Sequence, residues 1–286
     1  MTVKMLTRIR ACGLFSLLIL PLLAPAHAIA QAGAIDQGGG FVIAQHGTSV
    51  GMATVTVATN PKGYETSSVV HVSMKGLNYA LSKTEQLSAA NHLRHVNLSA
   101  TVNSSAVNVT AAHNAAEILL NISANGHSSS TRLAAHPYSV FLPDFDPGAL
   151  DTLLALAAAH NNRDLWAILP KQSGSAAASE APIALATYAD EQGALDGKPV
   201  EAHHLVATIA GARTDLFSGP DNQLLQAELP QQGFAIIRKG FVLTPPAKAG
   251  APPAAPLQPQ RPTPQQPPQQ AVPQAQPPGS TGAVQP

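Results

Sequence analysis

Alternation of small apolar and polar residues through the middle of the chain is the feature that most constrains its fold. Val55, Val57 and Thr59 alternate with Thr and Ala, and residues 69–74 and 118–122 repeat the pattern. Because a period of two residues places successive side chains on opposite faces of a strand, these segments are expected to be strands with one buried face.

Turn-forming residues separate these segments. Asn60-Pro61-Lys62-Gly63 lies between the first two long runs, and Asn125-Gly126 separates residues 118–124 from 127–134. Pro presets the second position of a turn, and Asn-Gly is the strongest short hairpin signal. With further turns near 195–199 and 218–222, about ten strands are expected in one antiparallel domain over 41–243.

One helix is expected within this domain, over about 147–160. Asp146 is placed to cap its start and Pro147 suits its first turn. Leucines at 150, 153 and 154 form one apolar stripe, which has to be buried against another element. The strands are rich in Ala, Ser and Thr, which allows close curvature. The predicted fold is mainly β: a strongly curved antiparallel sheet, an open or half barrel, with one short helix covering it.

The amino terminus has the pattern of an export signal over residues 1–28. Lys4, Arg8 and Arg10 precede a short apolar run at 13–23, and small residues allow cleavage after Ala28 or Ala30. The run is about half the ~20 residues that a membrane-spanning helix needs, so no membrane span is expected after signal removal. The expected location is outside the cytoplasm, in the periplasm or the extracellular space.

Two further segments are expected to lack a core of their own. Residues 29–40 form a Gly- and Ala-rich flexible lead-in, and 245–286 form a Pro/Gln-rich tail without an aromatic residue. Such a tail cannot bury enough apolar surface to offset the entropy of ordering its backbone. It is expected to be disordered, with local polyproline II character.

Charge and histidine placement exclude several classes of function. Lys plus Arg and Asp plus Glu number 16 each, so the chain lacks the basic surface that nucleic-acid binding requires. The histidine pairs 92/95 and 203/204 fall in expected strands, where each pair projects to opposite faces. No metal site and no cofactor are expected, because such a site needs three or four convergent ligands.

Two short motifs imitate hydrolase sites. Residues 47–51 match G-x-S-x-G, but a nucleophile elbow needs a helix after the serine, whereas residues 52–57 alternate as a strand. A hairpin is therefore expected around Ser49. Residues 109–113 resemble the segment around the catalytic histidine of chymotrypsin-like proteases, without the matching nucleophile segment. No catalytic residue is expected.

The order of parts resembles a known group of envelope proteins. Phe41-x-x-x-Gln45-x-Gly47-x-x-x-Gly51 opens the strands, a helical interruption extends from Phe141-Leu142-Pro143-Asp144 to Trp166-Ala167-Ile168-Leu169-Pro170, and further strands end in Asp221–Pro230. This layout is similar to uncharacterised bacterial envelope proteins with the open β-barrel of the lipoprotein carrier LolA. The resemblance implies a curved sheet around a hydrophobic cavity covered by helices, and it transfers no functional residue.

The function expected from these features is that of an exported, non-enzymatic binding or carrier module. Its partner would be a lipid or other apolar ligand, or an envelope protein, held between sheet and helix. The candidate lining residues are Leu150, Leu153, Leu154 and Trp166. The alternatives are a secreted serine hydrolase that uses Ser49, and a structural or surface-adhesion protein.

Overall fold

The computed structural model describes residues 35–36, 38–170 and 178–244. The expected export signal over 1–28, most of the expected lead-in and the expected tail over 245–286 lie outside the described residues. Two strands, β1 and the start of β2, fall within the carboxyl-terminal part of the expected lead-in.

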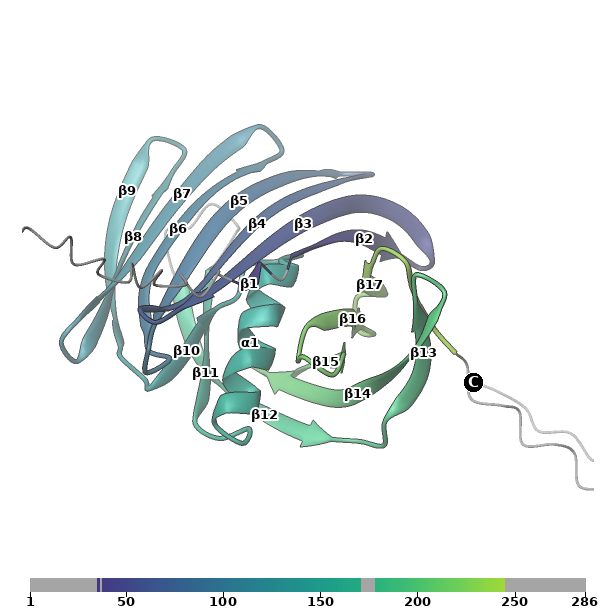
Figure 1. Cartoon of the computed structure of the whole chain (residues 1–286). Helices are drawn as coiled ribbons and strands as arrows, with labels where there is room; N and C mark the ends of the chain where they lie inside the picture. Colours follow the sequence, from purple (N-terminus) through teal and green to yellow (C-terminus); the bar gives the residue numbers. More distant parts are fainter. Residues whose placement is uncertain (1–34, 37, 171–177, 245–286) are drawn as a thin grey trace, which may run out of the picture. The chain divides into compact units, whose positions relative to one another are not determined.

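Strands make up most of the described residues, and one helix interrupts them, which confirms the predicted fold class (Figure 1). The first ten strands are β1 (Ile35–Asp36), β2 (Gly39–Gln45), β3 (Thr48–Asn60), β4 (Gly63–Met74), β5 (Leu77–Ser88), β6 (Leu93–Val102), β7 (Ser105–Asn114), β8 (Glu117–Ala124), β9 (His127–Ala134) and β10 (Tyr138–Phe141). After helix α1 (Pro147–Ala159) come β11 (Leu165–Pro170), β12 (Ala178–Thr187), β13 (Glu191–Leu195), β14 (Lys198–Ile209), β15 (Ala212–Ser218), β16 (Leu224–Leu229), β17 (Phe234–Arg238) and β18 (Phe241–Leu243). The expectation of about ten strands was therefore too low.

The sheet is a long curved strip built mostly from neighbouring hairpins. From β2 to β9, each strand pairs antiparallel with the next. On the other side of β2 the order continues through β17, β16, β15, β14, β12, β11 and β10. The pairing of β2 with β17 thus joins the two halves of the strip.

One pair departs from the expected antiparallel pattern. Strands β10 and β11 are parallel, with Tyr138 opposite Leu165 and Phe141 opposite Ile168. Parallel neighbours need a crossover connection, and α1 provides it. The helix therefore belongs to a strand–helix–strand unit, which sequence periodicity did not reveal.

Helix α1 has the predicted position and start. The Asp146 carboxylate accepts a hydrogen bond from the Gly148 amide at 2.9 Å, and Pro147 occupies the first turn. The helix lies on the concave side of the sheet, where it contacts β3, β4, β10 and β16 (Figure 1). Two hydroxyls, of Thr66 on β4 and Thr152 on α1, lie 3.1 Å apart in this buried contact. None of the described residues forms a helix long and apolar enough to cross a bilayer.

The two ends of the strip do not pair with each other. Strands β9 and β10 follow one another in the chain, yet they occupy opposite ends of the strip, and the described sheet stays open. Strand β10 instead lies close to β6, beneath the concave face. The edge of β10 that faces away from β11 meets charged side chains of β5, and these side chains form the centre of the site described next.

Candidate functional site

A buried ionic cluster holds β10 and the start of α1 against the sheet. Lys83 and Glu85 follow Tyr79 and Leu81 on the buried face of β5. The Lys83 Nζ atom lies 2.7 Å from Glu85 Oε2 and 2.7 Å from Asp146 Oδ2, and these three side chains are fully buried. We call Lys83, Glu85 and Asp146 the buried triad.

The triad also takes the place of a strand partner for β10. The Phe141 amide donates to Glu85 Oε1 at 2.9 Å, and its carbonyl accepts from Lys83 Nζ at 3.3 Å. Burial raises the pKa of Glu85, while the Lys83 ammonium acts in the opposite direction. For Lys83 the two carboxylates outweigh burial, and its pKa is raised. The triad therefore contains one cation facing two carboxyl groups.

The loop between β10 and α1, residues 142–146, separates two apolar spaces on the concave side. Phe145 has a left-handed backbone, with φ of 58°, which turns the loop sharply and is uncommon for a large side chain. Its ring packs edge-on against Tyr79 at 5.7 Å and against Phe234 at 4.9 Å. The Tyr79 hydroxyl donates to the Asp144 carbonyl at 3.2 Å and helps to fix the loop.

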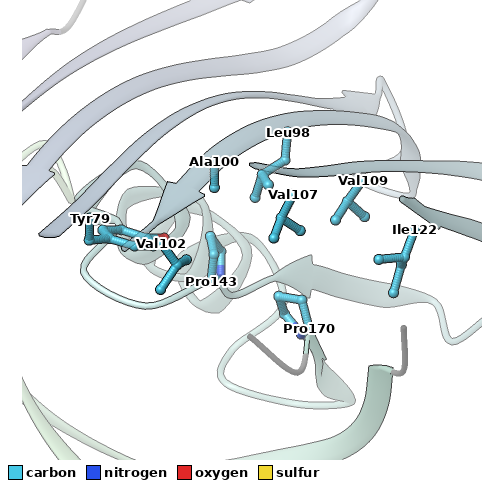
Figure 2. A pocket seen from close by; sticks show the side chains of 9 residues that line it. All are labelled: Tyr79, Leu98, Ala100, Val102, Val107, Val109, Ile122, Pro143 and Pro170. Atoms are coloured by element: carbon cyan, nitrogen blue, oxygen red, sulfur yellow. The ribbon is translucent and has the colours of Figure 1, made fainter. Parts of the chain in front are cut away.

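The first space is a narrow cleft beneath β5–β8, which we call the strand cleft. Figure 2 shows side chains of β6, β7 and β8 on one side, with Pro143 and Pro170 opposite them. Its lining is apolar apart from the Tyr79 hydroxyl, but its volume is only about 20 Å³. About one water-sized molecule fits in such a space, so the strand cleft is close to fully packed.

The second space, which we call the loop chamber, is much larger, with a volume of about 450 Å³. The loop 142–146, Leu150 of α1 and Leu169 of β11 form one side. The other side comes from the segment between Ile209 and Ile236, which includes β15, β16 and part of β17. Its size lies in the range of small-molecule pockets, and its wall is mainly apolar.

Asp144 is among the residues that line the loop chamber. The residue is exposed to solvent, and partial desolvation by the surrounding protein raises the pKa of its carboxyl group. The neighbouring carboxylate, that of Asp146, caps helix α1 as the sequence predicts.

A third space lies along another face of α1, and its wall is likewise mainly apolar. Its volume is about 490 Å³, and its lining includes Tyr64, Asp151 and Asp221. Asp151 Oδ1 accepts a hydrogen bond from the Leu224 amide at 2.6 Å, which ties α1 to β16. Burial raises the pKa of Asp151 to about 7, opposed by this hydrogen bond and by the charge of Arg238.

The four residues predicted to line a ligand site occupy different environments. Leu150 lines the loop chamber. Leu153 and Leu154 are buried in the core, with 0% and 3% of their surface exposed. Trp166 is half-buried on β11 and stacks on the His136 ring at 3.5 Å. Alternation along β11 places Leu169 in the loop chamber and Pro170 in the strand cleft, and Trp166 shares the face of Pro170.

The other sequence motifs fall on strands except His92, which was expected in a strand with His95 but lies just before β6. Ser49 lies on β3, opposite Ala44 of β2, so the segment around it is the expected hairpin. His203 and His204 lie on β14, next to Asp190 at 3.1 Å and Asp215 at 3.0 Å respectively. Across residues 35–36, 38–170 and 178–244, no group of three or more His, Cys, Asp or Glu side chains has the geometry to hold a metal ion.

Sequence reasoning missed the residues that build the site around the loop. Tyr79, Lys83 and Glu85 occupy inward-facing positions of β5, and the other inward positions of this strand are leucines. The sequence did contain a signal for their burial, because these two opposite charges share one face of the strand with the leucines. A strand that buries this face places the charges in the core. Phe145 had no such signal, since its position depends on the left-handed turn of the loop.

No protein-family model matches the chain, and no curated protein matches it. Among solved structures, the chain is similar to a beta-barrel-like protein of domain of unknown function DUF1849 from Brucella abortus. The two are 11% identical, the match covers 73% of this chain and 97% of the other, and the TM-score is 0.44. At this identity and TM-score the similarity transfers no residue and no function.

Proposed function

We propose that this protein is an exported, non-enzymatic binding or carrier module that holds a small apolar ligand in the loop chamber. The observation that carries the proposal is the chamber itself, about 450 Å³ of space with a mainly apolar wall on the concave side of the sheet. Pockets that bind small apolar molecules have this size and composition.

The construction of the chamber supports binding to a preformed site. One wall is the hydrogen-bonded sheet from β15 to β17, and the other is the loop that the buried triad and Tyr79 hold in place. A ligand would therefore meet a site that needs little ordering, and preorganisation of this kind raises affinity.

Two sequence features and one structural feature support the remaining parts of the proposal. The pattern over residues 1–28 supports export. The layout similar to the LolA group supports an apolar ligand, such as a single hydrocarbon chain. The strand–turn–strand geometry around Ser49 supports a role without a serine nucleophile.

A chamber-filling substitution tests the proposal. Ala212 lines the chamber from β15, whereas Ala184 is exposed on β12 and does not line it. We expect Ala212→Trp to abolish binding of the fluorescent apolar probe N-phenyl-1-naphthylamine to the purified protein, and Ala184→Trp to leave it unchanged. Thermal unfolding of both variants checks that the fold is intact.

The proposal fails if the parent protein does not bind the probe, or if both tryptophan variants bind it as the parent does. Native mass spectrometry of the purified protein adds an independent measurement. An apolar molecule that copurifies with the parent and is missing from Ala212→Trp supports the chamber as its site.

A further inference from the structure

We infer that Phe145 sets the length of the hydrocarbon chain that the loop chamber accepts, because its ring closes the chamber on the side of the strand cleft. This inference rests on the proposed function, since it assigns the chain-length specificity of the same chamber. The ligand class that it implies is an amphiphile with one unbranched chain, whose end stops at the ring. Three observations carry it: the two spaces adjoin, the ring lies at their boundary, and the backbone is fixed on both sides of the ring.

The strand cleft and the loop chamber adjoin at the loop 142–146. Pro143 lines both spaces. The successive residues Leu169 and Pro170 of β11 divide between them, with Leu169 lining the chamber and Pro170 lining the cleft (Figure 2). Both linings are mainly apolar, so a hydrocarbon chain that passed from the chamber towards the cleft would stay in apolar surroundings.

The ring of Phe145 occupies the boundary between the two spaces. Its centroid lies 4.9 Å from the ring of Phe234, which lines the chamber, and 5.7 Å from the ring of Tyr79, which lines the cleft. Phe145 itself lines the chamber and does not line the cleft. The end of a chain in the chamber therefore meets this ring before it reaches Tyr79, and removal of the ring would extend the chamber to the wall of the cleft.

Contacts on both sides of Phe145 hold its ring in this place. Among the described residues with a left-handed backbone, Phe145 is the one with a large apolar side chain. The Asp144 carbonyl before it accepts from the Tyr79 hydroxyl at 3.2 Å, and the Asp146 carboxylate after it lies 2.7 Å from Lys83 Nζ. A strained backbone persists where the surrounding structure enforces it, and such positions are frequent at ligand sites. The ring is therefore a fixed stop for a chain.

A series of unbranched alcohols tests the inference. Octanol, decanol, dodecanol and tetradecanol each compete with bound N-phenyl-1-naphthylamine on the purified parent, on Phe145→Gly and on Leu150→Ala. Glycine adopts the left-handed backbone readily, so Phe145→Gly removes the ring without a new strain in the loop. Leu150→Ala is the control, because Leu150 lines the chamber and not the cleft.

The expected readout is the chain length at which affinity stops rising. Each buried methylene strengthens binding about fourfold. We expect the affinity of the parent to reach a plateau once the chain end meets the ring. In Phe145→Gly the affinity should continue to rise beyond that plateau, with a gain over the parent of about fourfold for each further methylene. Leu150→Ala should weaken the binding of every alcohol and keep the plateau of the parent.

Three results overturn the inference and leave the proposed function intact: no plateau in the parent up to tetradecanol, the parent's plateau in Phe145→Gly, or an equal shift of the plateau in Leu150→Ala. If Phe145→Gly has lost its thermal unfolding transition, Phe145→Leu decides, because it keeps an apolar contact with a shorter side chain. The plateau of Phe145→Leu should also move to a longer chain, and an unmoved plateau overturns the inference. If the parent does not bind the fluorescent probe, the proposed function and this inference both fall.

Discussion

Substitution of Lys83 by Met tests whether the buried triad holds the β10–α1 unit in place. Met has a similar volume but no charge, so the change removes the ammonium group with little loss of packing. The Lys83 Nζ atom lies 2.7 Å from a carboxylate oxygen of both Glu85 and Asp146, and these side chains are fully buried. Without Lys83, two carboxyl groups remain in the interior with no cation to pair with.

The expected magnitude follows from protonation. Keeping one buried carboxyl protonated at pH 7, when its ordinary pKa is about 4.3, costs about 1.4 kcal/mol per pH unit, or about 4 kcal/mol. Breaking a buried ion pair from one side typically costs about 3–5 kcal/mol. We expect Lys83→Met to lower the free energy of unfolding by about 3–5 kcal/mol at pH 7.

The loss has a defined pH dependence. Carboxyl groups with raised folded-state pKa values stabilise the fold at low pH and destabilise it as the pH rises above their ordinary values. We therefore expect a smaller loss at pH 5 than at pH 8. Urea unfolding measures it, with fluorescence of Trp166, the only tryptophan of the chain, as the signal.

Arg132→Met is the control, because the pair of Arg132 with Glu117 at 3.3 Å is exposed and such pairs contribute little. If Lys83→Met destabilises the protein no more than Arg132→Met, or by the same amount at pH 5 and pH 8, the triad does not act as described.

Two further predictions concern helix α1. Because burial raises the pKa of Asp151 to about 7, its ionisation destabilises the fold, so the parent should lose stability as the pH rises from about 4 to 7. Asp151→Asn keeps an oxygen for the Leu224 amide and should flatten that decline in urea midpoints; an unchanged decline contradicts the assignment. Leu153→Ala should cost about 2–5 kcal/mol, because Leu153 is fully buried. Leu150→Ala should cost less in urea unfolding, because Leu150 lines the chamber; equal losses would place both leucines in the core.

The sequence predicted the elements whose signals are local. Alternation on β3 and β4, the Asn125-Gly126 turn and the Asp146 cap each depend on a few neighbouring residues, and the structure confirms them. These signals were sufficient for the fold class, because hairpins between neighbouring strands build most of the sheet.

The arrangement around the candidate site depends on contacts between distant residues, and no local signal reports them. Lys83 meets Asp146 across 63 positions of sequence, and the parallel pairing of β10 with β11 requires the helix to cross between them. Charged residues on a strand are usually solvated, so Lys83 and Glu85 did not stand out. Leu150 lines a chamber whose opposite wall comes from β15 to β17, which periodicity alone cannot place.

The pairing of β2 with β17 sets the order in which the chain can complete its fold. Phe41 of β2 pairs with Arg238 of β17. The backbone groups along this edge of β2 therefore lack their hydrogen-bond partners until nearly all the described residues have been synthesised. Contacts at such separation form slowly, because a long loop has to close first. During that interval β2 offers an exposed template for strand addition, which makes a newly made chain most vulnerable to aggregation at this seam.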